Sequence, residues 1–267
     1  MPALLLLLLA CPAPVAPSDT ALPETCEDGA SLFGRPEAAT GLSDAECGDT
    51  CACDGQAWAA PVYDDAAIAD LLRWELAEPY APVTDDPYAD PDPPAEAEGA
   101  VCGFVAEDAQ RYQLQTYDDL DQAQAAGARL THTGACGVCS TLEDLAVYIT
   151  VTDLTEPVRA CGLEHMGGTA EEHLACLEAL GFTTPCAWIW YWNTRNTQAQ
   201  CLSECLAALD QPYNLPDGSL NPCLQCDEDH SGPVFKAVAG RTRRNTGLPN
   251  AICRPCGEVT PIEHRYE

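Results

Sequence analysis

The stretch TPCAWIWYWNTRNTQAQCLSECLAAL, residues 184–209, contains the clearest structural signals in the chain. Thr184-Pro185 is typical of a helix start, because proline at the first helical position lacks only an N–H group that would have no partner there. The aromatic run that follows would also suit a strand, in which Trp188, Trp190 and Trp192 would share one face. We favour a helix and keep the strand as the alternative.

Further helices are predicted from capping signals in the second half of the chain. Ser140 and Thr169 each precede a glutamate by three residues, which is the capping-box pattern, and Gly181 would close the second of these helices. A last helix is expected to open at Thr197, with an apolar face made of Leu202, Cys205, Leu206 and Leu209. We therefore predict a mainly α fold, with a small disulfide-stapled helical domain over residues 101–267.

Composition restricts the possible partners and the compartment. The 267 residues include 42 acidic and 12 basic side chains, for a net charge of −30, and 17 cysteines. Such a negative charge opposes binding to nucleic acid phosphates, so we expect no nucleic acid partner. So many cysteines are typical of an oxidising compartment, in which disulfides persist. We expect an exported protein that needs no cofactor.

The amino terminus carries an export signal. Six leucines, residues 4–9, are followed by Ala10-Cys11, and Leu8-Leu9-Ala10-Cys11 resembles the lipobox of bacterial lipoproteins. The resemblance implies that residues 1–10 are a signal peptide and that Cys11 is acylated, so that a lipid anchor is the contact with the membrane. A plain signal peptide is the alternative, because Met1-Pro2-Ala3 carries no basic residue. Either reading predicts the bacterial cell envelope, lipid-anchored or secreted.

The rest of the chain divides by composition. Residues 11–25 form a Pro- and Ala-rich tether, and residues 26–78 a small irregular Cys-rich segment with an amphipathic helix capped by Asp64 or Asp65. Residues 79–100 are acidic and proline-rich, which predicts an extended linker and a domain boundary. The Cys-rich helical domain of residues 101–267 follows.

Three Cys-x-x-Cys pairs are the main candidates for chemistry. Cys136 and Cys139, with His132 nearby and a helix predicted just after them, would form the reactive centre of a thiol–disulfide oxidoreductase. The spacing of Cys223/Cys226 and Cys253/Cys256 is also that of a zinc knuckle. We favour structural disulfides for all three pairs. Cys201 and Cys205 lie one helical turn apart, and we expect Cys176 and Cys186 to be their partners.

A second candidate site is basic. Arg241, Arg243 and Arg244 stand together in an acidic chain, and with His230 they would bind an anionic small molecule or envelope component. The alternative is that these arginines pair with carboxylates of the protein itself. The stretch from Cys226 to Gly247, with Cys253-Arg-Pro-Cys256 after it, is similar to segments of uncharacterised secreted Cys-rich proteins, and that resemblance implies no activity.

These patterns support one leading function and two alternatives. Gly-x-Ser-x-Gly, His-Glu-x-x-His and phosphate-binding glycine loops do not occur in the sequence. We predict an exported envelope protein that acts as a binding or structural module. The alternatives are an exported thiol–disulfide oxidoreductase or other enzyme at Cys136/Cys139 with His132, and a zinc-stabilised binding module. The sequence leaves open whether the protein is an enzyme.

Overall fold

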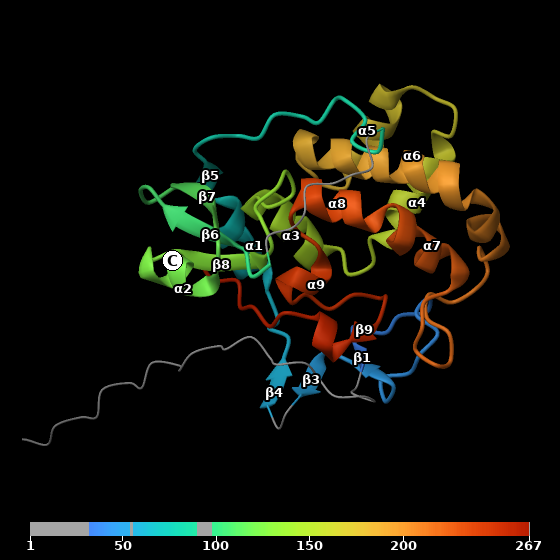
Figure 1. Cartoon of the computed structure of the whole chain (residues 1–267), viewed down its shortest axis with the longest axis horizontal. Helices are drawn as coiled ribbons and strands as arrows, with labels where there is room; N and C mark the ends of the chain where they lie inside the picture. The colour runs from blue at the N-terminus through green and yellow to red at the C-terminus, as the bar shows by residue number, and fades with distance from the viewer. Residues whose placement is uncertain (1–31, 54–55, 90–97, 267) are drawn as a thin grey trace, which may run out of the picture.

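The computed structural model describes residues 32–53, 56–89 and 98–266 (Figure 1). The predicted signal peptide, Cys11, the tether and the middle of the predicted linker lie outside these ranges. Within them, no helix is long and apolar enough to cross a membrane.

The fold is mixed α/β, so the prediction of a mainly α fold is wrong. A four-stranded sheet in the order β5-β7-β6-β8 stands at one end of the molecule, and two smaller sheets lie below it in the view of Figure 1. The strands of the large sheet are β5 (Glu75–Leu76), β6 (Val101–Ala106), β7 (Arg111–Tyr117) and β8 (Arg129–Thr133), with α2 (Leu120–Ala125) before β8. β6 pairs antiparallel with both β7 and β8. Both faces of β6 are buried, so its sequence is a short apolar run. Such a run shows neither a helical nor an alternating period, and the sequence pattern therefore did not identify the strand.

The two small sheets lie where the amino-terminal part of the described chain meets its carboxy-terminal part. Their strands are β1 (Leu32–Phe33), β2 (Cys47–Gly48), β3 (Thr50–Cys53), β4 (Gln56–Ala59) and β9 (Arg254–Pro255). β1 lies between β2 and β9, and β3 forms a hairpin with β4. Disulfides Cys47–Cys253 and Cys51–Cys256 cross-link the same region.

Helices make up most of the other end of the molecule (Figure 1). Besides α2, the helices of the described chain are α1 (Asp65–Leu72), which lies beside the large sheet, α3 (Leu142–Thr150), α4 (Thr155–Glu164), α5 (Ala170–Ala179), α6 (Thr184–Ala207), α7 (Pro222–His230), α8 (Gly232–Ala239), α9 (Arg243–Thr246) and the short 3-10 helix η1 (Cys256–Glu258). The tryptophan-rich stretch is helical, as predicted, but α6 continues through Thr197 without a break. The capping box of Thr169 is confirmed.

The predicted cap at Ser140 is wrong by one residue. Thr141 caps α3, and its side chain accepts a hydrogen bond from the Asp144 N–H group. The Ser140 hydroxyl is used elsewhere, because it contacts His132 Nε2 at 2.7 Å and accepts a hydrogen bond from the Gly137 N–H group.

The described part of the predicted linker contacts the helical core. Tyr80, Val83 and Tyr88 pack against the main cluster of buried side chains, and the Trp192 indole N–H donates to the Val83 carbonyl at 2.8 Å. Side chains from both sides of the predicted boundary also meet, since Trp74 packs edge-on against Phe104 with ring centroids 5.1 Å apart. The large sheet and most of the helices therefore share the main core, whereas the side chains at the small sheets pack into separate, smaller clusters.

Seven disulfides connect the described residues. Besides the two at the small sheets, they are Cys102–Cys136, Cys139–Cys186, Cys161–Cys176, Cys201–Cys226 and Cys205–Cys223. Disulfide formation is therefore confirmed, whereas Cys176 and Cys186 as partners of Cys201 and Cys205 are wrong. α7 packs beside the second half of α6 and brings its own two cysteines there. The bridges suit an extracellular or otherwise oxidising compartment.

The glycine of the Cys136-x-x-Cys139 pair is required by a close approach of two chain segments. A Cβ atom on Gly137 would lie 2.3 Å from the Val238 carbonyl oxygen, which accepts a hydrogen bond from the Val138 N–H group. We expect Gly137→Ala to lower the free energy of unfolding by about 2–3 kcal/mol, because neither backbone can move away cheaply. Urea unfolding followed by circular dichroism measures the change. Gly48→Ala is the control, since its Cβ would meet nothing closer than 3.7 Å. A Gly137→Ala protein as stable as the control would contradict the close approach.

Candidate functional site

A cavity of about 480 Å³ lies between the helices of the larger end of the molecule. Its walls come mainly from α4, α6, α7, α8 and α9, with contributions from Tyr148 on α3 and from Asn250. A volume of this size is typical of pockets that enclose a small organic ligand. The cavity is therefore the first candidate for a functional site in the described chain.

The mouth of the cavity is apolar. Its rim side chains are 40–52% exposed and are Leu163, Met166, Leu202, Leu206 and Leu209. The last three share one face of the α6 helix and its continuation, because they stand four and three residues apart. The sequence predicted this apolar face as a packing surface, whereas the structure leaves it exposed at an opening. Exposed apolar side chains gathered at one place are typical of binding surfaces.

Three buried polar atoms in the cavity walls form no well-aligned hydrogen bond with the described residues. They are the Tyr148 hydroxyl, the Trp190 indole N–H and the Asn250 side-chain oxygen, all buried. An unpartnered buried polar group costs about 1–3 kcal/mol, and native proteins contain few of them. Burial raises the pKa of Tyr148, and the nearby Arg243 guanidinium opposes that rise, so the phenol stays neutral. The Trp190 indole N–H contacts the Tyr148 hydroxyl closely enough to lower its pKa, so these two groups face each other within the cavity wall.

A satisfied polar network forms another part of the wall. Asp227 on α7 accepts hydrogen bonds from the Asn193 amide at 3.3 Å and from the Thr197 hydroxyl, both on α6. The Thr197 hydroxyl also lies 3.1 Å from that of Ser231. Burial raises the pKa of the Asp227 carboxyl, and these hydrogen bonds oppose the shift. Since its members already have partners, this network holds α6 and α7 together.

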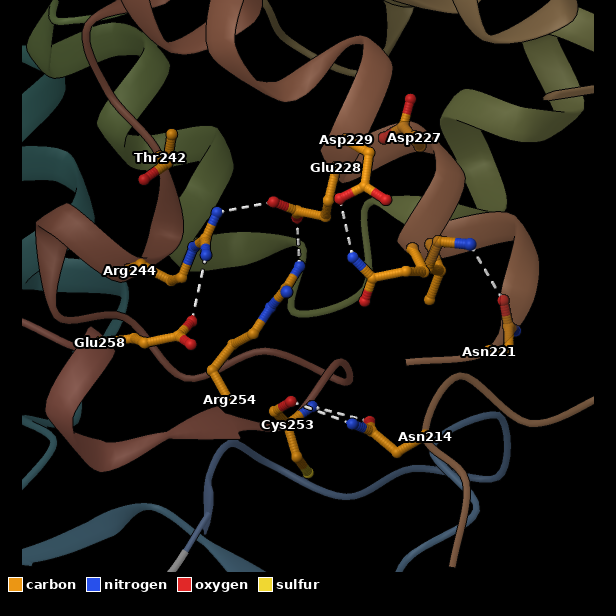
Figure 2. Close-up of polar contacts among 12 residues, drawn as sticks. Asn214, Asn221, Asp227, Glu228, Asp229, Thr242, Arg244, Cys253, Arg254 and Glu258 are labelled. Carbon is orange, nitrogen blue, oxygen red and sulfur yellow. Dashed lines mark hydrogen bonds and ion pairs between the residues drawn. The ribbon is translucent and has the colours of Figure 1, made fainter. Parts of the chain in front are cut away.

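An ion-pair cluster stands where α7, α9, β9 and η1 meet, as Figure 2 shows. Glu228 accepts hydrogen bonds from Arg244 at 2.7 Å and from Arg254, and Arg244 also donates to Glu258 at 3.1 Å. The Arg254 side chain is mostly buried, and burial lowers its pKa while Glu228 opposes that shift. The cluster therefore joins four elements by charge, and Glu228 is its centre.

We expect Glu228→Gln to lower the free energy of unfolding by about 1–2 kcal/mol. The substitution leaves the buried Arg254 without its carboxylate, although the partial exposure of Glu228 and Arg244 reduces the loss. Thermal unfolding of the oxidised protein measures it. Glu258→Gln is the matched control, because Glu258 is half exposed and its ion pair among the described residues is with Arg244. Equal effects of the two substitutions would show that Glu228 is not the centre.

The residues predicted to bind an anion do not converge on one site. Arg241 is fully buried and donates to the carbonyls of Thr131, Cys139 and Ser140, at 2.9–3.3 Å. Arg243 also donates to backbone carbonyls, whereas Arg244 donates to carboxylates. His230 is exposed at the end of α7. Arg243 and Arg244 line the cavity, whereas Arg241 and His230 do not.

The predicted reactive cysteines are held in separate bridges. Cys136 is bound to Cys102 and Cys139 to Cys186, so the two sulfur atoms do not form one pair. His132 is buried, with Nδ1 2.9 Å from the Thr133 carbonyl, and burial holds its pKa well below the ordinary value. The cysteines predicted as alternative zinc ligands are bridged as well. Glu164, His165 and Cys176 lie close enough to share a metal ion, but Cys176 is bound to Cys161.

Comparison with known proteins gives one match within the chain. Residues 170–262 match a family of unknown function (DUF8771). The matched region contains α5 to α9, so it includes the α6 and α7 walls of the cavity and the ion-pair cluster, but not α4 or Tyr148. No curated protein and no solved structure matches the chain.

Sequence reasoning missed the inner end of the cavity. Tyr148 and Asn250 stand more than a hundred residues apart and carry no motif, and Trp190 was predicted only as part of an aromatic cluster in a helix or strand. The one usable signal was the apolar face at Leu202, Leu206 and Leu209, at the end of the helix whose first half carries partly buried aromatic side chains.

Proposed function

We propose that the protein is an exported binding module, lipid-anchored or secreted at the bacterial cell envelope, whose ligand site is the cavity between α4, α6, α7 and α8. The observation that carries the proposal is the combination of apolar walls with a few polar side chains, among them Tyr148, Trp190 and Asn250. A pocket that binds a small molecule has this composition, in which apolar surface supplies affinity and a few polar groups fix orientation.

The disulfides support a binding role because they hold the cavity walls in place before a ligand arrives. Cys201–Cys226 and Cys205–Cys223 fix α7 against α6, and Cys161–Cys176 joins the end of α4 to α5. A rigid pocket loses less conformational entropy on binding than a mobile one. The separate bridges of Cys136 and Cys139 give no comparable support to a thiol–disulfide enzyme.

A neutral apolar probe tests this proposal. We expect N-phenyl-1-naphthylamine to bind the oxidised protein with one-to-one stoichiometry and increased fluorescence. Leu206→Asp should weaken its binding about tenfold, because a charge at the apolar mouth must be partly desolvated when the probe enters. Leu72→Asp is the matched control, since Leu72 on α1 is 55% exposed, close to the 52% of Leu206, and does not line the cavity. Absence of saturable binding, or equal binding by both variants, would overturn the proposal.

A further inference from the structure

Three separate clusters of buried apolar side chains face the cavity. The main core contributes Leu154, Val158, Phe235 and Leu248, the cluster beside α7 contributes Leu224 and Ile252, and the cluster at the small sheets contributes Phe33 and Val259. The cavity therefore occupies the space where the three clusters meet. Apolar surface that lines such a space lacks the packing contacts found in the rest of a protein interior. An apolar occupant would supply these contacts and would join the three clusters.

The charged side chains of the cavity walls already have partners in the protein. Those described above are Asp227 in its network with α6, and Glu228 with Arg244 and Arg254 in the ion-pair cluster. Arg159 forms an ion pair with Glu156 at 3.0 Å, and Lys236 is not without a partner either. A charged ligand would have to compete with these contacts in a place where it is itself partly removed from water.

Arg243, the remaining charged residue of the walls, is also balanced. It is buried and donates hydrogen bonds to the carbonyls of Tyr148 at 2.7 Å and Pro249 at 3.1 Å. Burial lowers the pKa of Arg243 to about 10, and the carboxylates of Asp153 and Glu37 are among the groups that oppose the shift. Among the described residues that line the cavity, every charged side chain thus has its partners within the protein, so the walls favour a ligand without charge.

The apolar lining continues from the mouth of the cavity to the small sheets. Leu206 and Leu209 stand at the exposed rim, and Phe33, which also lines the cavity, is only 2% exposed. The volume of about 480 Å³ lies in the lower half of the range of roughly 300–1,000 Å³ that is typical of small-molecule sites. A single hydrocarbon chain suits such a space better than the two chains of a membrane phospholipid.

We infer that the ligand is an uncharged molecule with one hydrocarbon chain, which lies between the three clusters and has its polar end among the apolar side chains of the mouth. This inference rests on the proposed function, because it names the chemical class of the ligand for the same cavity. The affinity comes from apolar surface that is removed from water, so it rises with the length of the chain. A charged end group lowers the affinity, since it is partly desolvated at the mouth without a partner.

Three probes with the same chain test the charge of the ligand. We expect decanol to bind the oxidised full chain at least tenfold more tightly than decanoate or decyltrimethylammonium in isothermal titration calorimetry, at concentrations below micelle formation. A charged probe that binds as tightly as decanol would overturn the uncharged class while the proposed cavity function stands. Binding of the naphthylamine probe without binding of decanol would also overturn the class alone. Failure of every probe would overturn the class and the proposed function together.

Chain length and shape test the fit of the ligand. Each methylene added between hexanol and decanol should tighten binding about threefold to fourfold, because it removes more apolar surface from water. The matched compound 1-adamantanol holds the same number of carbon atoms as decanol in a compact cage, and we expect it to bind at least tenfold more weakly. An affinity that does not rise with chain length, or a cage that binds as tightly as the chain, would overturn the single-chain class.

Filling the cavity tests the position of the chain. Val158→Phe on α4 adds a ring to the wall, and we expect it to weaken decanol binding at least tenfold, because the ring occupies space that the chain needs. Val62→Phe is the matched control and should keep full affinity, since Val62 is 80% exposed and does not line the cavity. Leu224→Phe on α7 repeats the test from another wall in case Val158→Phe fails to fold. Unchanged decanol affinity in the variants that fold would overturn this placement.

Discussion

Replacing Arg241 with methionine is expected to lower the free energy of unfolding by about 3–5 kcal/mol. The guanidinium group is completely buried and donates hydrogen bonds to three backbone carbonyls, those of Thr131, Cys139 and Ser140. These carbonyls belong to β8 and to the turn before α3, so one side chain joins the sheet to the helical part. Methionine fills similar volume but leaves all three acceptors without a donor in a place that water does not reach.

Two other variants separate hydrogen bonding from charge and size. Arg241→Lys keeps the positive charge but lacks the planar set of donors, so we expect a loss nearly as large as that of Arg241→Met. Arg265→Met removes an exposed arginine that pairs with Glu263, and its effect should stay within about 0.5 kcal/mol. Urea unfolding of the oxidised proteins provides the comparison. A fully stable Arg241→Lys protein would mean that the charge alone is required.

Arg241 also shows where sequence reasoning reaches its limit. The basic cluster stood out in an acidic chain, and its composition favoured anion binding, because composition does not reveal burial. The structure instead places Arg241 in the interior, Arg243 in the cavity wall and Arg244 in an ion-pair cluster. Three neighbouring residues thus have three roles, and only their tertiary surroundings distinguish them.

Local signals predicted the helices well and the sheet badly. The capping box at Thr169 and the proline near the start of α6 act within one helical turn, so the sequence alone contains them. β6 can be recognised as a strand only from its pairing with β7 and with β8, and β8 begins more than twenty residues after β6 ends. Disulfide connectivity has the same limit, since Cys47 and its partner are 206 residues apart. The candidate cavity depends on such long-range contacts, and only the apolar side chains at its mouth could be predicted from the sequence.

The second large effect is a loss of stability in acid, which we expect His264 to cause. This histidine is buried, its Nε2–H donates to the Thr246 carbonyl at 2.8 Å, and its Nδ1 accepts from the Tyr266 hydroxyl at 2.9 Å. Burial, with the charge of Arg241 nearby, lowers the pKa of His264 to about 3. In the unfolded chain the pKa of His264 returns to about 6.5, so the unfolded state binds a proton that the folded state does not bind. His264 therefore removes about 2–3 kcal/mol of stability as the pH falls from 7 to 4.5.

Asp144 works in the opposite direction over the same range. Its buried carboxyl accepts hydrogen bonds from the Thr183 N–H group and from the hydroxyls of Thr141 and Thr183, yet burial outweighs them and raises its pKa to about 6. The folded state holds this proton below pH 6, whereas the unfolded state does so only below about 4. Asp144 thus adds about 2 kcal/mol of stability as the pH falls from 7 to 4.5.

The opposite signs allow one experiment to test both groups. The free energy of unfolding in urea is measured between pH 7 and 4.5 for the parent protein, His264→Gln and Asp144→Asn. We expect His264→Gln to lose less stability on acidification than the parent, and Asp144→Asn to lose more. The change of the free energy of unfolding with pH does not depend on how the substitution alters stability at pH 7. A variant that is less stable at pH 7 therefore still tests the prediction. A parental slope in His264→Gln would mean that this imidazole is protonated in the folded state and is not held neutral by its buried position.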